Sequence, residues 1–367
     1  MGRFKVFSLA ALAALASLAL AACGEPAAPA GPKLALDAPL PEAIPPGTKL
    51  VIGDPTTQRV LEHTGWIKEL PFEVEWAQIS GGPAVTEAFH ARALDVGSAA
   101  NIPPIHAVWV GIPVKMIAVR LRRDPENYPL FELGIAPKAG IATLADLRGK
   151  KIAYSPGQVQ GEVVLRTLAA QGLTEQDVTL VELPSTGDVY PNALVSGLVD
   201  VAPLGAGVAT KRYLDNYAKD GAKVLRHPPY RDDLTNLYVR TETLQDPAKA
   251  AALRAYVKLW ARATEWQATH KAEWRDVYYV KNQGLSPQDA QFVVQASGDP
   301  VIPHDWTEAI GLQQSSIDFL ARSGGQKLFD AAEIFDRRFE ALAAEAAPAI
   351  ADAGPSQLAQ AQGSRQP

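Results

Sequence analysis

The sequence predicts an α/β protein of two similar lobes, each a mainly parallel sheet flanked by helices, with a ligand cleft between the lobes. Three observations support this prediction. The chain has 367 residues, a length that suits about two domains of roughly 100–200 residues. Hydrophobic residues make up 47% of the chain, enough for packed cores, and charged residues make up an ordinary 20%. Two stretches about one hundred residues apart are also similar, which indicates a duplicated architecture.

The duplication consists of three pairs of segments in the same order. The pairs are "KLVIGDPT" at 49–56 with "KKIAYSPG" at 150–157, "VEWAQISGG" at 74–82 with "TLVELPSTG" at 179–187, and "EAFHARALDVG" at 87–97 with "NALVSGLVDVA" at 192–202. The matched residues include Ser80 with Ser185, Gly82 with Gly187, and Asp95 with Asp200. Each repeat reads strand, turn, helix, strand, turn, helix, strand, which predicts βαβ units. The alternative is chance similarity between generic βαβ units.

The N-terminus is predicted to be removed rather than folded. A basic start at Arg3 and Lys5 precedes an apolar run over 6–20 that is too short to span a bilayer comfortably. Residues 1–22 therefore read as a signal peptide. "LAAC" at 20–23 is similar to the lipobox of bacterial lipoproteins, in which the cysteine carries the lipid. Cys23 is the only cysteine, so lipidation is the expected role, with an ordinary cleaved signal as the alternative.

Composition and capping signals divide the rest of the chain. The strand after the second repeat is expected at "TNLYVR", 235–240, and the later helices are expected to begin at Asp246, Ser286 and Asp305 and to pack on lobe one. No second apolar run is long enough to cross a membrane. The predicted parts are a Pro/Ala-rich tether at 23–47, the first part of lobe one at 48–139, lobe two at 140–232, the return to lobe one at 233–345 and a disordered tail at 346–367.

Four turns at the carboxyl ends of predicted strands are the candidate ligand contacts. They lie at 54–58, 80–83, 95–104 and 155–161, and each has small or hydroxyl residues before a predicted helix. Free backbone N–H groups and the positive helix end make such turns suitable for an anion. Ordinary helix capping is the alternative reading of each turn. None of the four resembles a phosphate-binding loop.

Several function classes are disfavoured. The net charge of −5 and the lack of a basic run argue against a nucleic-acid surface. The six histidines show no i, i+4 pairing and no clustering with cysteine, so we expect no metal site, and we expect no cofactor. No G-x-S-x-G elbow occurs, and we expect no enzyme. Asp95 and Asp200 are interpreted as structural, with a carboxylate pair split between lobes as the alternative. The expected core tryptophans are Trp260, Trp266 and Trp274.

Three stretches carry a family resemblance: "VEWAQISGGPAVTEAFHARALDVGSAANIPPI", "ATLADLRGKKIAYSPGQVQGEVVLRTLAAQGL" and "LPSTGDVYPNALVSGLVDVAPL". Over about Leu50 to Phe339 the chain resembles the solute-binding lipoproteins of ABC importers, in the group of aliphatic sulfonate, taurine and nitrate receptors and the related thiamine-precursor binders. The resemblance implies a two-lobed periplasmic-binding-protein fold of type II. It also implies a cleft that closes on a small ligand, and docking on a membrane permease served by an ATPase.

The resemblance also implies ligand contacts from both lobes. The implied lobe-one residues are Thr56, Thr57, Ser80, Gly81, Gly82, Ser98, Ala99 and Asn101, and the implied lobe-two residues are Ser155, Gly157, Gln158 and Gln160. Two departures stand out. Many relatives carry a Tyr-Gln pair where this chain has "GDP" at 53–55. Many carry a Trp-Asp-Pro-type segment where this chain has "PLGAGVATKR" at 203–212, which makes Leu204 and Gly205 further candidates.

These departures imply a ligand larger than taurine or of another shape. Asp54, if it points into the cleft, would disfavour a simple sulfonate by charge repulsion. The expected function is capture of a small anionic or polar solute, such as a sulfonate, nitrate or a related organic compound, for import. The expected protein is a monomer in the periplasm or at the cell surface, held to a bacterial membrane only by its lipid. The alternatives are a sensory receptor for a membrane signalling partner, or a binder of a thiamine or pyrimidine precursor or an aromatic acid.

Overall fold

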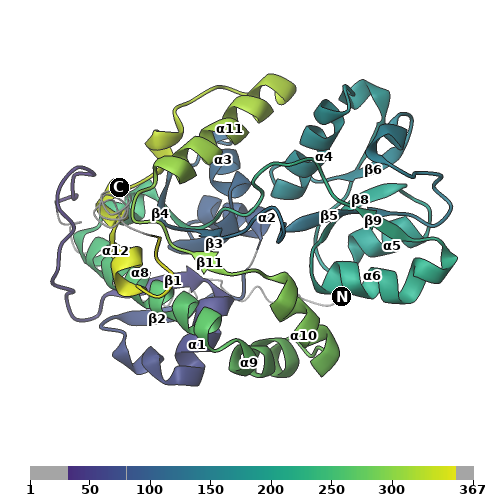
Figure 1. Ribbon diagram of the computed structural model, residues 1–367. Coiled ribbons are helices and arrows are strands. Elements are labelled where there is room, and N and C mark those ends of the chain that lie inside the picture. Colours follow the sequence, from purple (N-terminus) through teal and green to yellow (C-terminus); the bar gives the residue numbers. More distant parts are fainter. Residues whose placement is uncertain (1–31, 80, 353–367) are drawn as a thin grey trace, which may run out of the picture. The chain divides into compact units, whose positions relative to one another are not determined.

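The computed structural model describes residues 32–79 and 81–352 (Figure 1). The predicted signal peptide, the predicted lipidation site Cys23 and the candidate residue Ser80 lie outside the described residues. Among the described residues, none of the helices combines the length and the apolar character that a membrane crossing requires.

The first of two sheets has six strands in the order β11-β4-β10-β3-β1-β2. The strands are β1 (Lys49–Gly53), β2 (Glu73–Trp76), β3 (Val96–Ala100), β4 (Val114–Arg122), β10 (Thr235–Arg240) and β11 (Pro300–Val301). β1 pairs in parallel with β2 and β3, whereas β10, β4 and β11 are joined by antiparallel pairings. We call the body built on this sheet lobe I.

The second sheet has five strands in the order β7-β6-β8-β5-β9. The strands are β5 (Phe131–Ile135), β6 (Lys151–Tyr154), β7 (Thr179–Glu182), β8 (Val201–Gly205) and β9 (Lys223–Leu225). β6 is parallel to β7 and β8, and β5 is antiparallel to β8 and β9. We call the body built on this sheet lobe II.

The α/β class with two lobes is confirmed, but both sheets are mixed rather than mainly parallel. The duplication predicts only the three parallel strands that form one side of each sheet. Four of the remaining strands, β4, β5, β9 and β10, flank the two segments that cross between the lobes, and these four and β11 add to the sheets in the antiparallel sense. Because β5 pairs with strands of lobe II, the first crossing falls at 123–130, ahead of the expected boundary at 140. Pairing with strands more than sixty residues away leaves no local signal in the sequence.

Thirteen elements provide the helical layers among the described residues. Those before the second sheet or after it are α1 (Pro55–Thr64), α2 (Gly82–His90), α3 (Ile102–Trp109), α7 (Thr241–Leu244), α8 (Pro247–Thr269), α9 (Lys271–Trp274), α10 (Pro287–Ala296), α11 (Thr307–Gly324), α12 (Leu342–Ala346) and a π-helix at Arg275–Asn282. Lobe II contributes α4 (Val159–Ala170), α5 (Val189–Val195) and α6 (Val208–Tyr217). Figure 1 shows α3 and α11 toward the top of lobe I and α1 and α9 toward the bottom.

Short 3-10 helices fill several connections. They span Trp66–Glu69, Leu144–Leu147, Glu175–Asp177, Ala218–Asp220, Ala331–Ile334 and Arg337–Phe339. The predicted caps of the C-terminal helices are confirmed for α8 and α10. Asp246 accepts the N–H groups of the first turn of α8, and Ser286 accepts the N–H of Asp289 at 3.1 Å. The three C-terminal tryptophans are buried, as expected for core residues.

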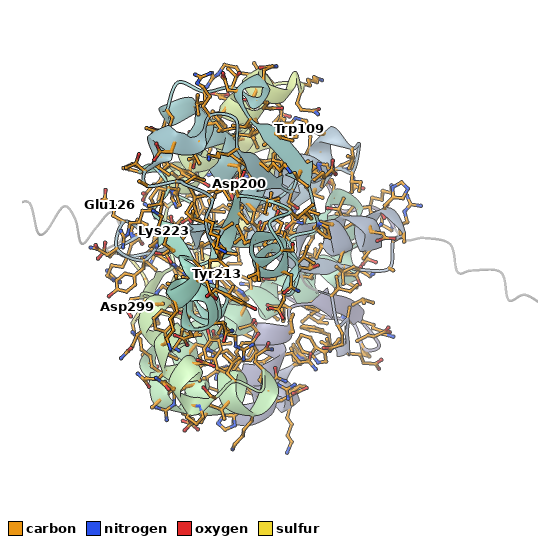
Figure 2. All side chains as sticks on the ribbon, turned by 90° about the vertical axis from the view of Figure 1, so that its right-hand side faces the viewer. Trp109, Glu126, Asp200, Tyr213, Lys223 and Asp299 are labelled. Carbon is orange, nitrogen blue, oxygen red and sulfur yellow. The ribbon has the colours of Figure 1, made fainter. Side chains whose placement is uncertain are left out.

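The two aspartates matched by the duplication occupy equivalent positions. Asp95 accepts the backbone N–H of Val51 at 2.9 Å, and Asp200, labelled in Figure 2, accepts that of Lys151 at 2.8 Å. Each carboxylate therefore ties the start of the third strand of a repeat to its first strand, and the structural interpretation is supported. These two hydrogen bonds make Val51 equivalent to Lys151, an offset of 100 residues. The sequence alignment of 49–56 with 150–157 uses an offset of 101, so it is out of register by one residue.

The described parts of the expected tether and tail pack against lobe I. Leu36, Leu40 and Ile44 contact its hydrophobic core, and the backbone N–H of Leu34 donates to the carbonyl of Gln245 at 2.8 Å. At the other end, residues 350–352 bond to the chain around Ile302. Apolar residues spaced four apart at 36, 40 and 44 are the sequence signal for this packing, and the high proline content obscured it.

The segment "DVGSAANIPP" at 95–104 contains a strand and the first residues of a helix rather than one long turn. β3 runs through Ala100, and α3 begins at Ile102. A small residue is needed in this strand because α2 packs closely against it at Gly97. A Cβ placed on Gly97 would lie 2.3 Å from Cγ1 of Val85 and 3.3 Å from the ring of Tyr238. Only a glycine fits there.

Candidate functional site

Two crossing segments connect the lobes, and buried carboxylates hold them in place. Asp232 accepts the N–H groups of Leu130 and Phe131 at 2.9–3.0 Å, which joins the second crossing to the first. Asp233 accepts the N–H of Arg122 at 2.6 Å. Both aspartates are almost fully buried. These bonds let one crossing segment position the other, as a hinge requires.

Both lobes line a large cleft of about 1390 Å³. Lobe I contributes α2 and α3, and lobe II contributes the turns that follow β6 and β7. The cleft thus lies beyond the carboxyl ends of parallel strands, where ligands bind in open α/β sheets. Five of the predicted contacts line it, namely Gly81, Ser155, Gly157, Gln158 and Gln160.

Glycines bring the two walls of this cleft together at one point. A Cβ on Gly157 of lobe II would lie 2.8 Å from Cδ2 of His106 in α3. A Cβ on Gly82 would lie 3.7 Å from the carbonyl oxygen of Gly157, and Gly157 has a φ of +74°. The backbone of the lobe-II turn therefore approaches α2 and α3 directly. Burial lowers the pKa of His106, so its imidazole is neutral at neutral pH.

Two of the helices that face the cleft receive no side-chain cap from the described residues. These are α2, which follows Gly81, and α4, which follows Gln158. By contrast, Asp54 caps α1. Capping alone therefore does not explain the residues before α2 and α4. Their N–H groups and helix dipoles remain available to an anion.

Gln158 is positioned by a contact that the sequence interpretation missed. Its Oε1 accepts the hydroxyl of Ser185 at 2.6 Å, and Ser185 itself lines the cleft with Thr186 and Gly187. The duplication matches Ser185 to Ser80 and Gly187 to Gly82, so the signal was present in the alignment. The other polar cleft residues that the sequence did not indicate are Thr86, Glu87, His90, His106 and Glu182.

The turn before α1 packs into lobe I, and a ligand contact by Thr56 or Thr57 stays a prediction. Asp54 accepts the N–H of Thr57 at 3.3 Å and the hydroxyl of Tyr256 at 3.0 Å, and burial raises its pKa. Its carboxylate is thus committed to the core of lobe I. Thr57 is buried, Thr56 is half-buried, and neither lines the cleft.

Ser98, Ala99 and Asn101 also lie outside the cleft lining. Ser98 and Ala99 pair with β10 inside the sheet. Asn101 is buried, and its amide nitrogen donates to Glu162 of α4 at 3.2 Å and to Ser316 of α11 at 3.1 Å. This side chain thus joins lobe I to lobe II. A direct contact of these three residues with a ligand stays a prediction.

Leu204 and Gly205 end β8. The side chain of Leu204 is buried in the core of lobe II, close to Gly134, so any ligand contact there would come from the backbone. The carbonyl of Gly205 accepts the hydroxyl of Thr210 at 3.0 Å. A Cβ added to Gly205 would meet no atom within 4 Å, so this position has open space beside it.

The charge of the cleft is unusual for an anion site. Among the described residues no lysine or arginine lines it, while Glu87 and Glu182 do. A ligand would be held by backbone N–H groups, amides, hydroxyls and neutral imidazole. No cluster of metal-ligating side chains occurs within residues 32–79 and 81–352.

Comparison with known proteins identifies the family. Residues 60–270, more than half of the chain, match the model of the family described as NMT1/THI5 like. The chain belongs to this family.

Two curated proteins and several solved structures are similar to this family member. Both curated proteins are named "Putative aliphatic sulfonates-binding protein". The one from Bacillus subtilis (strain 168) is 26% identical over 76% of this chain and 82% of its own length. The one from Escherichia coli (strain K12) is 30% identical, but the match spans only 29% of this chain and 32% of that protein.

The solved structures show the fold. The periplasmic aliphatic sulphonate binding protein SsuA from Escherichia coli aligns with a TM-score of 0.64 at 20% identity, over 79% of this chain and 92% of SsuA. The alkanesulfonate-binding protein SsuA from Xanthomonas axonopodis pv. citri, bound to MOPS, gives 0.64 at 19% identity, over 83% and 98%. The desulfurization enzyme DSZB gives 0.52 at 15% identity, over 87% and 100%.

Proposed function

We propose that this protein captures a small organic sulfonate, or a related anionic or polar solute, outside the cytoplasm and delivers it to an ABC permease. The observation that carries the proposal is the meeting of two uncapped, glycine-containing turns from opposite lobes across one cleft. Helix N-termini with free N–H groups bind anionic oxygens without needing a cation. The names of the similar proteins, which are binding proteins for sulfonates, support the same class of ligand.

The two carboxylates in the lining bear on the kind of sulfonate. Glu87 and Glu182 would repel the sulfonate group itself, so we place that group at the starts of α2 and α4. The carboxylates then face the other end of the ligand, where an amine or hydroxyl would be favoured. A cleft of about 1390 Å³ exceeds what a ligand as small as taurine needs.

A ligand screen tests this function. Thermal unfolding is measured with taurine, longer alkanesulfonates, MOPS, nitrate, pyrimidine precursors and aromatic acids. A ligand at a hundred times its Kd should stabilise the protein by about 2.7 kcal/mol. Gln160→Trp, which places a bulky side chain in the cleft from the start of α4, should abolish the stabilisation by the longer sulfonates. Stabilisation by longer alkanesulfonates or MOPS that survives Gln160→Trp, or no stabilisation by any sulfonate, would count against the proposal.

The same screen separates binding from catalysis. DSZB shares the fold, so each stabilising ligand is recovered after incubation and analysed by mass spectrometry. Unchanged ligand is the expected result for a binding protein, and a desulfonated product would overturn it.

Anchoring by lipid at Cys23 forms part of the proposal. The supporting observation is the "LAAC" segment, together with the single cysteine of the chain. Cys23→Ser should release the mature protein from membranes and abolish incorporation of labelled fatty acid. Membrane retention of that variant would refute the anchor while leaving the ligand proposal intact.

A further inference from the structure

A second cavity, of about 220 Å³, lies at the edge of lobe I beside the crossing segments, and it is separate from the residues that line the cleft. We call it the Arg120 pocket. Its principal polar residues are Arg120, Arg122, Asp233, Thr235, Lys271 and Ser297. Cavities that hold drug-sized ligands are usually about 300–1,000 Å³, so this one suits a smaller ion.

Strand β4 supplies two arginines to the wall of this pocket. Arg120 and Arg122 are two residues apart and so project from the same face of the strand. Among the described residues neither forms an ion pair within 4.0 Å. Nε of Arg120 donates to the hydroxyl of Thr235 at 2.8 Å, and Arg122 donates to the carbonyls of Tyr128 and Pro129.

The acidic groups near the two arginines are already occupied. Asp233 receives hydrogen bonds from Arg231 at 2.6 and 2.8 Å and from the N–H of Arg122. Asp54 influences Arg120 electrostatically, but its oxygens accept bonds from Thr57 and Tyr256. Burial is the largest influence on both pocket arginines and lowers the pKa of each. The charge of Arg120 also lowers the pKa of Arg122, while Asp54 acts in the opposite sense on Arg120, and Asp232 and Asp233 do so on Arg122.

Other donors complete the wall. Lys271 contributes a third cation, paired at 2.5 Å with Asp299, an exposed residue labelled in Figure 2. The hydroxyls of Thr235 and Ser297 and the side chains of Gln267 and Tyr279 also line the cavity. A desolvated cation that forms no ion pair in direct contact is costly, and a bound anion that receives hydrogen bonds lowers that cost.

We propose that the Arg120 pocket binds a small tetrahedral oxyanion, either a free ion such as sulfate or the head group of a short organic sulfonate. The site does not depend on the function proposed for the cleft. The Arg120 pocket lies at the same edge of the lobe-I sheet as the end of β3. Arg120 pairs with Thr235, and Thr235 pairs with Ala100, the last residue of β3. Two strand spacings put Arg120 about 10 Å from that strand.

Binding of sulfate and of methanesulfonate to the whole mature protein tests the proposal. Trp274 lines the pocket and stacks on Tyr278 at 4.4 Å, so bound anion should change the tryptophan fluorescence. Trp274→Phe should remove that signal while calorimetry still detects binding. Equal affinities would indicate a free-ion site, and at least tenfold tighter methanesulfonate would indicate a head-group site.

Two variants and one control locate the ion. Arg120→Gln removes a cation of the wall, and Ala268→Leu fills the cavity without changing charge. Both should weaken anion binding at least tenfold. Arg262→Gln, on the same helix as Ala268 but paired with Glu69 outside the pocket, should bind like the wild type. If Arg120→Gln does not fold, Ala268→Leu decides the question.

The cleft variant Gln160→Trp keeps the two sites distinguishable. It should leave sulfate binding unchanged even if it abolishes the ligand response of the cleft. The proposal is overturned if no saturable binding occurs up to about 10 mM anion, if Ala268→Leu binds like the wild type, or if Gln160→Trp abolishes sulfate binding. If sulfate binds but no compound of the screen binds in the cleft, the proposed function is refuted and the proposal for the Arg120 pocket is not affected.

Discussion

Gly157→Ala should disturb both folding and ligand binding through a single methyl group. Gly157 has a φ of +74°, a left-handed conformation that costs a residue with a Cβ about 1–2 kcal/mol. The added Cβ would also lie 2.8–3.1 Å from three ring atoms of His106. Carbon atoms attract at about 3.5–4.0 Å, so either the ring or the lobe-II turn must move.

A second glycine separates the two costs. Gly172 has a φ of +64°, and a Cβ there would meet no atom within 4 Å. Gly172→Ala therefore reports backbone strain alone, about 1–2 kcal/mol of stability. Gly157→Ala adds an overpacking cost of about 1–3 kcal/mol. If Gly157 and His106 are in contact without ligand, this overpacking cost lowers the free energy of unfolding. If they come into contact only when ligand is bound, the cost raises the Kd of the ligand.

Urea unfolding and calorimetric titration with the best-bound sulfonate of the screen measure the two parts. An excess of 1.4 kcal/mol that falls wholly on binding would raise Kd about tenfold. His106→Ala combined with Gly157→Ala should recover most of the excess, and a double-mutant cycle isolates the interaction. The predicted clash is refuted if Gly157→Ala and Gly172→Ala show equal changes in unfolding free energy and in Kd. It is also refuted if removing the His106 ring recovers neither stability nor affinity.

Three further predictions concern the fold. Asp95→Ala should cost about 2–3 kcal/mol in urea unfolding, and Asp200→Ala only about 1 kcal/mol, because the first carboxylate is buried and also pairs with a lysine at 2.7 Å; equal losses would contradict this. Burial raises the pKa of Tyr213 to about 12, so its folded form stays neutral while the unfolded chain ionises near pH 10. Stability should fall as pH rises through that window, and Tyr213→Phe should show a shallower fall, together with a loss of about 1 kcal/mol at pH 7 from the hydrogen bond of 2.6 Å; an unchanged alkaline profile would argue against it. Gly97→Ala should destabilise the protein by about 1–3 kcal/mol or more, and Val85→Ala should partly rescue it, as thermal unfolding of the double variant would show; an absence of rescue would mean that the clash lies elsewhere.

The sequence predicted the lobe-II wall of the cleft better than the lobe-I wall. Ser155, Gly157, Gln158 and Gln160 all line the cleft, because a four-residue connection after β6 leaves the turn exposed before α4 begins. In lobe I only one residue separates β1 from α1. Asp54 therefore caps the helix and enters the core, and the threonines after it do not line the cleft. Loop length, which sequence patterns define to within a few residues at best, made this difference.

Local chemistry was enough to determine the class and much of the order of this fold. The strand–helix alternation, the repeated aspartates and the proline-containing helix starts each act through neighbouring residues, so they are visible in the sequence. The antiparallel strands, the packed N-terminal segment, the contact of Gly157 with His106 and the cationic wall of the Arg120 pocket were decided only in three dimensions. Each joins residues fifty or more positions apart, and the duplication relates equivalent positions within the two lobes but not the contacts between them.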